Sequence, residues 1–93
     1  MERVTRHLRI EGRVQGVGYR FFMEAVAAEH GIAGWVRNRR DGSVEALVAG
    51  SLHAVEAVIA AARRGPPHAR VTEVRVAESA LPAGDGFRTL PTE

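Results

Sequence analysis

The stretch from Gly12 to Arg20 reads Gly-Arg-Val-Gln-Gly-Val-Gly-Tyr-Arg, and the rest of the fold can be worked out from it. Its three glycines separate an alternating apolar strand from an amphipathic segment, and an arginine stands where that segment begins. Glycines leave backbone N–H groups free to point inward, and the start of a helix adds partial positive charge. The pattern predicts a loop that holds a phosphate-like anion.

The residues on either side of this loop change their periodicity. From Leu8 to Val14, apolar and charged residues alternate, which is typical of a half-buried strand. From Phe21 to His30, apolar residues recur at helical intervals, and Gly31 ends the run. The sequence therefore predicts a strand, a glycine loop and a helix, in this order.

A hairpin and a second helix come next. Gly34–Asn38 reads as a strand, residues 39–42 as a turn and Val44–Val48 as the returning strand. Ser51 is a suitable N-cap for an apolar stripe that runs from Leu52 to Ala62.

Two further strands, Val71–Val76 and the weaker Phe87–Leu90, complete the order β-α-β, β-α-β with a short tail. This order predicts the α+β class. We expect a ferredoxin-like βαββαβ sandwich in which two helices cover one face of an antiparallel sheet. A length of 93 residues without a linker predicts a single domain over residues 1–93.

Composition excludes several kinds of chemistry. The chain has no cysteine, so disulfides, thiolate metal sites and cysteine nucleophiles are ruled out. Its four histidines lack metal-ligand spacing, and no carboxylate pair stands out, so we expect no metal and no other cofactor. The absence of a long apolar run and of a signal peptide predicts a soluble, cytoplasmic protein.

The aromatic residues Phe21, Phe22 and Trp35 are expected to pack in the hydrophobic core.

Arg20 is electrostatically misplaced, because cations are stabilised at the opposite end of a helix. An anion that accepts a bidentate guanidinium pair together with backbone N–H bonds would explain it. The alternative is an ordinary surface arginine. The loop is neither a Walker A motif nor a dinucleotide fingerprint, because no Gly-Lys-Ser/Thr ending and no third glycine follow Gly18.

Asn38 is the only asparagine of the chain and ends a predicted strand. Its carboxamide can donate and accept hydrogen bonds, so it could hold a water molecule beside the anion if the first and second strands lie near each other. The competing interpretation is that this asparagine merely opens the turn at residues 39–42.

Two motifs resemble those of the acylphosphatase family. The first is Ile-Glu-Gly-Arg-Val-Gln-Gly-Val-Gly-Tyr-Arg at residues 10–20. The second is Gly-Trp-Val-Arg-Asn-Arg-Arg-Asp-Gly-Ser-Val at residues 34–44, with Gly50 closing the hairpin. Both follow the order and spacing of the family, and the likeness extends through Gly65–Val71 to Phe87.

The resemblance implies an acylphosphatase, a hydrolase that converts an acyl phosphate to a carboxylate and inorganic phosphate without a metal. It implies that Arg20 binds the phosphoryl group and that Asn38 orients the attacking water. In this family the substrate phosphate is thought to accept the proton of the water, so no side-chain base is required. The implied phosphate-binding loop, acting through its backbone N–H groups, comprises Gln15, Gly16, Val17, Gly18, Tyr19 and Arg20.

Two other functions compete with this enzyme. A similar domain begins the hydrogenase-maturation carbamoyltransferases, which continue into zinc-finger and further domains, so a length of 93 residues favours the enzyme over a binding module. An RNA-binding ferredoxin-like domain would need aromatic side chains on its sheet, and an aromatic content of 5% disfavours it. The expected partner is therefore a small acyl phosphate, with no nucleic acid and no membrane, and the expected state is a monomer.

Overall fold

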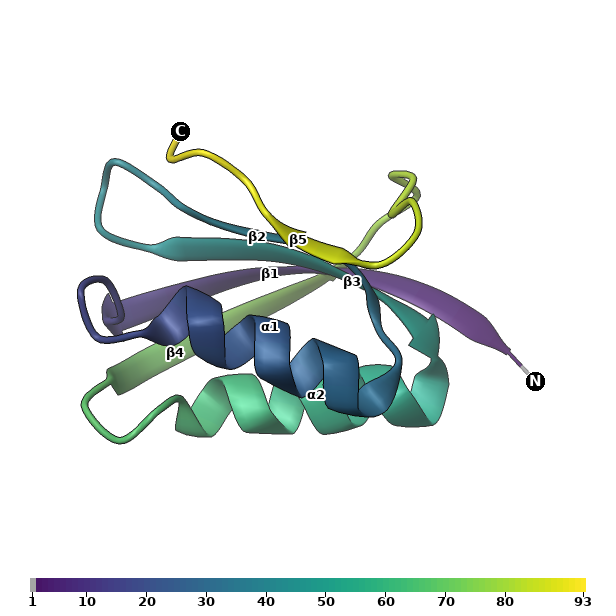
Figure 1. Ribbon diagram of the computed structural model, residues 1–93, viewed down its shortest axis with the longest axis horizontal. Helices are drawn as coiled ribbons and strands as arrows, with labels where there is room; N and C mark the ends of the chain where they lie inside the picture. Colours follow the sequence, from purple (N-terminus) through teal and green to yellow (C-terminus); the bar gives the residue numbers. More distant parts are fainter. Residues whose placement is uncertain (1) are drawn as a thin grey trace.

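A computed structural model describes residues 2–93 as one sheet with two helices packed on the same face (Figure 1). In chain order the elements are β1 (Arg3–Arg13), α1 (Tyr19–His30), β2 (Ala33–Asn38), β3 (Val44–Ser51), α2 (Leu52–Arg64), β4 (Arg70–Glu78) and β5 (Phe87–Thr89). The predicted α+β class and the βαββαβ order are confirmed.

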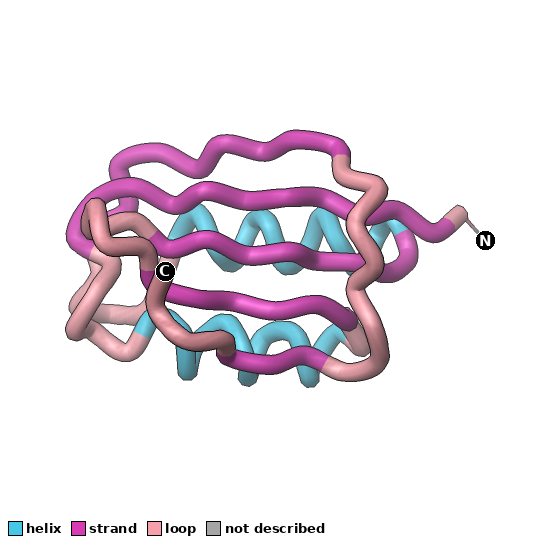
Figure 2. Tube along the Cα trace, turned by 90° about the horizontal axis from the view of Figure 1, so that it is seen from above, coloured by secondary structure: helices cyan, strands magenta, loops and turns pink. Residues whose placement is uncertain are grey.

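The sheet has the strand order β4-β1-β3-β2-β5. β1 pairs antiparallel with both β3 and β4, and β2 pairs antiparallel with β3. The short β5 is the exception, because it runs parallel to β2, so the sheet is mixed where we expected it to be antiparallel throughout. Figure 2 shows the cause: the chain leaves β4 at one edge of the sheet and crosses the other strands before it reaches the opposite edge.

Local signals set the ends of both helices. α1 ends at Gly31, whose φ of 65° lies in the left-handed region that glycine adopts without strain. α2 begins after Ser51, whose hydroxyl oxygen accepts a hydrogen bond from the backbone N–H of Ala54 at 3.1 Å. Both boundaries agree with the sequence, whereas α1 starts at Tyr19, ahead of the expected Phe21.

The core lies between the sheet and the two helices. Its fully buried members are apolar and include one aromatic residue: Leu8, Ile10, Tyr19, Met23, Ala27, Val36, Val44, Ala46, Val48, Val55, Val58 and Ala62. Neither helix of the described chain is long and apolar enough to cross a membrane.

The prediction that Phe21 belongs to the core is wrong, since its side chain is 77% exposed. Tyr19 and Met23 are buried at a spacing of four residues, and each residue advances 100° around a helix, so Phe21 points away from the face that they share. Phe22 does pack against the core. Trp35 does not belong to the core as expected: it is partly exposed on β2, with the Cζ atom of Arg37 4.8 Å from the centroid of its ring.

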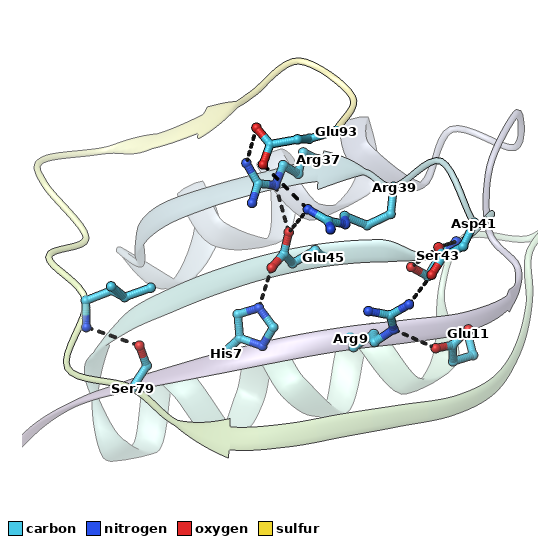
Figure 3. A network of polar contacts seen from close by, with 11 residues as sticks. His7, Arg9, Glu11, Arg37, Arg39, Asp41, Ser43, Glu45, Ser79 and Glu93 are labelled. Atoms are coloured by element: carbon cyan, nitrogen blue, oxygen red, sulfur yellow. Dashed lines mark hydrogen bonds and ion pairs between the residues drawn. The ribbon is translucent and has the colours of Figure 1, made fainter.

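The face of the sheet that is turned away from the helices carries a network of charged side chains (Figure 3). Glu45 on β3 is central to it, because its Oε2 lies 2.6 Å from Nε2 of His7 and its Oε1 accepts from Nε of Arg37 at 2.7 Å. Arg37 and Arg39 each also pair with Glu93. These contacts connect β1, β2, β3 and the segment after β5.

Candidate functional site

The glycine loop between β1 and α1 owes its backbone conformation to two left-handed glycines. Gly16 and Gly18 have φ values of 74° and 80°, both in the left-handed region, and Gly18 is the N-cap residue of α1. A Cβ atom built at either position meets no heavy atom within 4 Å, so glycine is required by the backbone conformation and not by lack of space. Gly18 leaves the start of α1 without a side-chain cap, so no side chain of that residue blocks the N–H groups of the first turn.

A pocket of about 340 Å³ opens at this loop. Figure 1 shows the loop and the β2–β3 turn at the same end of the molecule. The pocket is lined by residues of the loop, of α1 and of the ends of β2 and β5, namely Val14, Gly16, Gly18, Tyr19, Arg20, Phe21, Glu24, Asn38 and Thr89. Arg20 and Asn38, which the sequence singles out separately, therefore line one pocket.

Both side chains are available to a ligand. Within residues 2–93, neither the guanidinium of Arg20 nor the carboxamide of Asn38 forms a hydrogen bond or ion pair with another residue. The guanidinium is a fork of N–H donors with a fixed positive charge, and the carboxamide offers both a donor and an acceptor. Such a pair can hold an anion and orient a polar molecule beside it.

The first and second strands are not neighbours, because β3 lies between them. Asn38 pairs with Val44 on β3, and Val44 in turn pairs with Ile10 on β1. The loop after β1 therefore has to reach past the end of β3 to meet Asn38. The backbone N–H of Glu93 donates to the carbonyl of Asn38 at 3.1 Å, which supports β2 from its other side.

Gln15 makes the connection between the loop and the hairpin. Its Nε2 donates to the carbonyl oxygens of Arg39 at 2.7 Å and of Ser43 at 2.8 Å. The Ser43 carbonyl also accepts from the backbone N–H of Arg39 at 2.8 Å, so the glutamine bonds to the carbonyls at the base of the turn. The sequence indicated a role for the backbone of Gln15, and this role of its side chain was missed.

The turn itself is held by Asp41. Its Oδ1 accepts from the hydroxyl of Ser43 at 2.7 Å and from the backbone N–H of Ser43 at 3.0 Å, and Arg9 forms an ion pair with the same carboxylate. Hydrogen bonds from the side chain and then the backbone of Ser43 hold the pKa of Asp41 below its usual value. Asp41 therefore shapes the turn that follows Asn38.

Tyr19 anchors the other end of the loop. It is buried, and its hydroxyl donates to the carbonyl of Ala62 on α2 at 2.6 Å. Burial raises the pKa of this phenol far above its ordinary value, so it stays protonated and keeps donating. Arg20 is the next residue, and its backbone is therefore fixed by a buried neighbour.

Three pocket residues gave no functional signal in the sequence: Phe21, Glu24 and Thr89. Glu24 follows Arg20 by four residues on α1, so helical spacing alone would have placed the two side chains on one face. Thr89 joins the site only through the crossing of the chain to β5. Across the described residues 2–93, no group of three or more His, Asp or Glu side chains gathers in a way that could hold a metal ion.

The fold and the pocket define a small ferredoxin-like α+β protein with a glycine loop at one end of its sheet. The acylphosphatase family model matches residues 6–89. The chain is 50% identical over 98 residues to the acylphosphatase of Rhodopseudomonas palustris (strain BisB18), with 99% of each chain covered. It is 38% identical to the solved acylphosphatase of Bacillus subtilis, with a TM-score of 0.89 and coverage of 94% of this chain and 98% of that one.

A longer protein contains the same fold. The structure of HypF from T. kodakarensis is 32% identical with a TM-score of 0.81, and it is matched over 96% of this chain but 12% of its own. The chain belongs to the acylphosphatase family and is therefore a hydrolase of acyl phosphates.

Proposed function

We propose that the pocket at the glycine loop is the active site and that Arg20 and Asn38 are its two catalytic side chains. The observation that carries this proposal is that both residues line one pocket, while neither the guanidinium of Arg20 nor the carboxamide of Asn38 is bonded to another group of residues 2–93. Arg20 and the backbone N–H groups from Gln15 to Arg20 hold the phosphoryl group of an acyl phosphate, and Asn38 orients the attacking water.

The reaction is an in-line displacement at phosphorus. The oxygen of the water forms a bond to phosphorus, and the bond between phosphorus and the carboxyl oxygen breaks with its electron pair going to the departing carboxylate. A phosphate oxygen of the substrate takes the proton from the water. Phosphoryl transfer of this kind calls for positioning and charge stabilisation more than for covalent chemistry, and a fixed guanidinium with aligned N–H groups supplies both.

The first test replaces the guanidinium. Arg20→Ala should lose the binding of inorganic phosphate and at least about 10²-fold in kcat/KM, because the main positive charge of the pocket is gone. Phosphate release from benzoyl phosphate, compared with that from a phosphate monoester, measures turnover, and calorimetric titration measures phosphate binding. Arg64→Ala, which removes an exposed arginine at the end of α2, is the matched control. Near-normal hydrolysis by Arg20→Ala would remove the basis of the proposal.

The second test separates binding from catalysis. Asn38→Ala should bind inorganic phosphate normally but lose roughly 10²-fold or more in kcat, by analogy with the loss of an oxyanion-hole donor. The carboxamide acts on the water and not on the phosphoryl group, so the two measurements must diverge. A variant that loses phosphate affinity and turnover in parallel would mean that Asn38 is part of the cradle and not the water-orienting group.

We also propose that hydrolysis needs no metal ion, which the lack of a gathered ligand set within residues 2–93 supports. Dialysis against EDTA should leave kcat/KM for benzoyl phosphate unchanged, and added Mg²⁺ should not increase it. Activity that disappears with the chelator and returns with a divalent ion would contradict this part of the mechanism.

A further inference from the structure

The pocket contains a carboxylate that the hydrolysis above does not use. Glu24 lies four residues after Arg20 on α1 and lines the same pocket. Side chains at this spacing have Cβ atoms roughly 5–6 Å apart, and an arginine and a glutamate so placed ordinarily attract each other. A negative charge thus stands one helical turn from the positive charge that binds phosphate.

A hydroxyl from the edge strand holds this carboxylate. Oγ1 of Thr89 on β5 donates to Oε2 of Glu24 at 2.6 Å. Among the ion pairs of residues 2–93, none involves Glu24. Glu24 is therefore held toward Thr89 on β5 and forms no ion pair with Arg20, so the positive and the negative group of the pocket remain separate.

Apolar groups border Glu24 on the side away from Arg20. The exposed ring of Phe21 lines the same pocket. Beyond Glu24, a second pocket of about 380 Å³ continues between α1 and β5 and is lined mainly by small and apolar residues such as Ala27, Ile32 and Phe87. Glu24 borders both pockets, so a molecule that extends from Arg20 toward this second pocket has to pass its carboxylate.

We propose that Phe21 and Glu24 form the acyl side of the active site and that Glu24 makes the enzyme select acyl phosphates whose acyl group carries no negative charge. This inference rests on the proposed function, because it assumes that the phosphoryl group is bound at Arg20. The acyl half then extends toward Phe21 and the second pocket. A neutral, apolar acyl group packs on the ring of Phe21, whereas an acyl group with its own carboxylate is repelled by Glu24.

The expected preference for a neutral over a charged acyl group follows from the distance between the two carboxylates and from the dielectric constant of the open pocket. A second carboxylate at roughly 6–8 Å from Glu24, at an effective dielectric constant of about 40–80 in an open pocket, lowers kcat/KM by about threefold to tenfold. Salt screens this repulsion, since raising ionic strength from about 0.01 M to about 1 M shortens the Debye length from about 30 Å to about 3 Å.

The test compares benzoyl phosphate with its para-carboxylated analogue, terephthaloyl monophosphate, which differ by one carboxylate. The measured quantity is the ratio of the two kcat/KM values in the wild type divided by the same ratio in Glu24→Gln. Differences in intrinsic reactivity between the two substrates cancel in this double ratio. The glutamine keeps an oxygen that can accept from Thr89, so the variant changes charge with little change of shape. A double ratio of about three to ten in favour of the neutral substrate is expected.

Glu29→Gln is the matched control, because it removes the same charge from an exposed position further along α1, and its double ratio should be one. A double ratio of one for Glu24→Gln, or an equal loss on both substrates, would overturn the inference while leaving the proposed hydrolysis intact. Failure of the wild type to hydrolyse either substrate would instead refute the proposed function.

Salt provides a second test that needs no variant. In the wild type, high NaCl should raise kcat/KM for the carboxylated substrate relative to kcat/KM for benzoyl phosphate. An unchanged ratio would count against Glu24.

Discussion

At the scale of single residues, Gln15 shows how one side chain brings two distant parts of the site together. The loop that contains it and the turn that follows Asn38 have no backbone pairing with each other, and the two bonds from Nε2 of Gln15 to Arg39 and Ser43 connect them. The position of Asn38 relative to the loop therefore depends on a residue whose side chain does not line the pocket. Gln15 is best described as a positioning residue.

Replacing this amide by a carboxylate should disconnect the two parts. Gln15→Glu turns a double donor into an acceptor facing two carbonyl oxygens, so we expect a loss of about 1–3 kcal/mol of folding stability. We also expect kcat to fall more than phosphate affinity, because the loop keeps its own shape while Asn38 moves. Denaturant unfolding, steady-state kinetics and phosphate titration measure the three effects. Equal losses of kcat and phosphate affinity would show that Gln15 acts on the loop alone.

At the scale of the elements, Tyr19 ties the two helices together where the site begins. It is the first residue of α1, and its hydroxyl bonds to the carbonyl of Ala62 near the end of α2. Because it is buried, its pKa is raised above the ordinary value of 10.0. A tyrosine that ionises only in the unfolded chain stabilises the fold fully below pH 10, and this stabilisation is lost as pH rises beyond that value.

The chain has one tyrosine, so this effect can be measured directly. The ultraviolet absorbance of the phenolate should stay absent in the native protein at pH values slightly above 10 and should appear together with the loss of native circular dichroism. In strong denaturant the same group should titrate near pH 10. A phenolate signal at pH 10 in the fully folded protein would contradict the burial of Tyr19.

At the scale of the whole molecule, the outer face of the sheet is held by a network centred on Glu45. Burial by itself would raise the pKa of this carboxyl, but hydrogen bonds from His7 and Arg37, together with their charges, outweigh burial and lower it. A carboxyl whose pKa is lowered by folding stabilises the protein at pH values above the pKa that it has in the unfolded chain, which is 4.5 for Glu45. That stabilisation is lost as the pH falls through the lower pKa that Glu45 has in the folded protein.

The acid side of the stability profile should therefore depend on Glu45. We expect the free energy of unfolding of the wild type to decline below about pH 4.5, and Glu45→Gln to decline less while being roughly 0.5–1 kcal/mol less stable at pH 7. Urea unfolding at several pH values checks both points. Glu73→Gln, which breaks an exposed pair with Arg75, serves as control and should keep the profile of the wild type.

The parts of the fold that were predicted correctly are those with local causes. Gly31 ends α1 and Ser51 caps α2 through bonds within a few residues, and the sequence displays both signals. The parallel β5 could not be predicted in this way, because its partner β2 is chosen by the crossing of the chain and not by the three residues of the strand. The exposure of Phe21 was predictable from helical periodicity, had Tyr19 and Met23 been assigned to the buried face.

At the candidate site too, features with local causes could be predicted from the sequence, and features that depend on the path of the chain could not. Arg20 and Asn38 each stand out chemically within their own segments, and the family resemblance favoured them as site residues, whereas their shared pocket depends on the fold. The bond between Glu24 and Thr89 joins residues 65 positions apart, so no local pattern indicates it. The roles of the site residues, the single-domain organisation and the monomeric state stay predictions.

The loop that precedes α1 is already shaped before any substrate arrives. Its glycines adopt their left-handed conformations in the folded chain, and Gln15 and Tyr19 fasten it at both ends. Fixing the backbone of one residue costs roughly 1–2 kcal/mol of conformational entropy, and this entropy is lost when the chain folds and not when a ligand binds. Under the proposed function, substrate binding does not have to order the loop, so less of the free energy of the contacts to the phosphoryl group is lost to ordering the backbone.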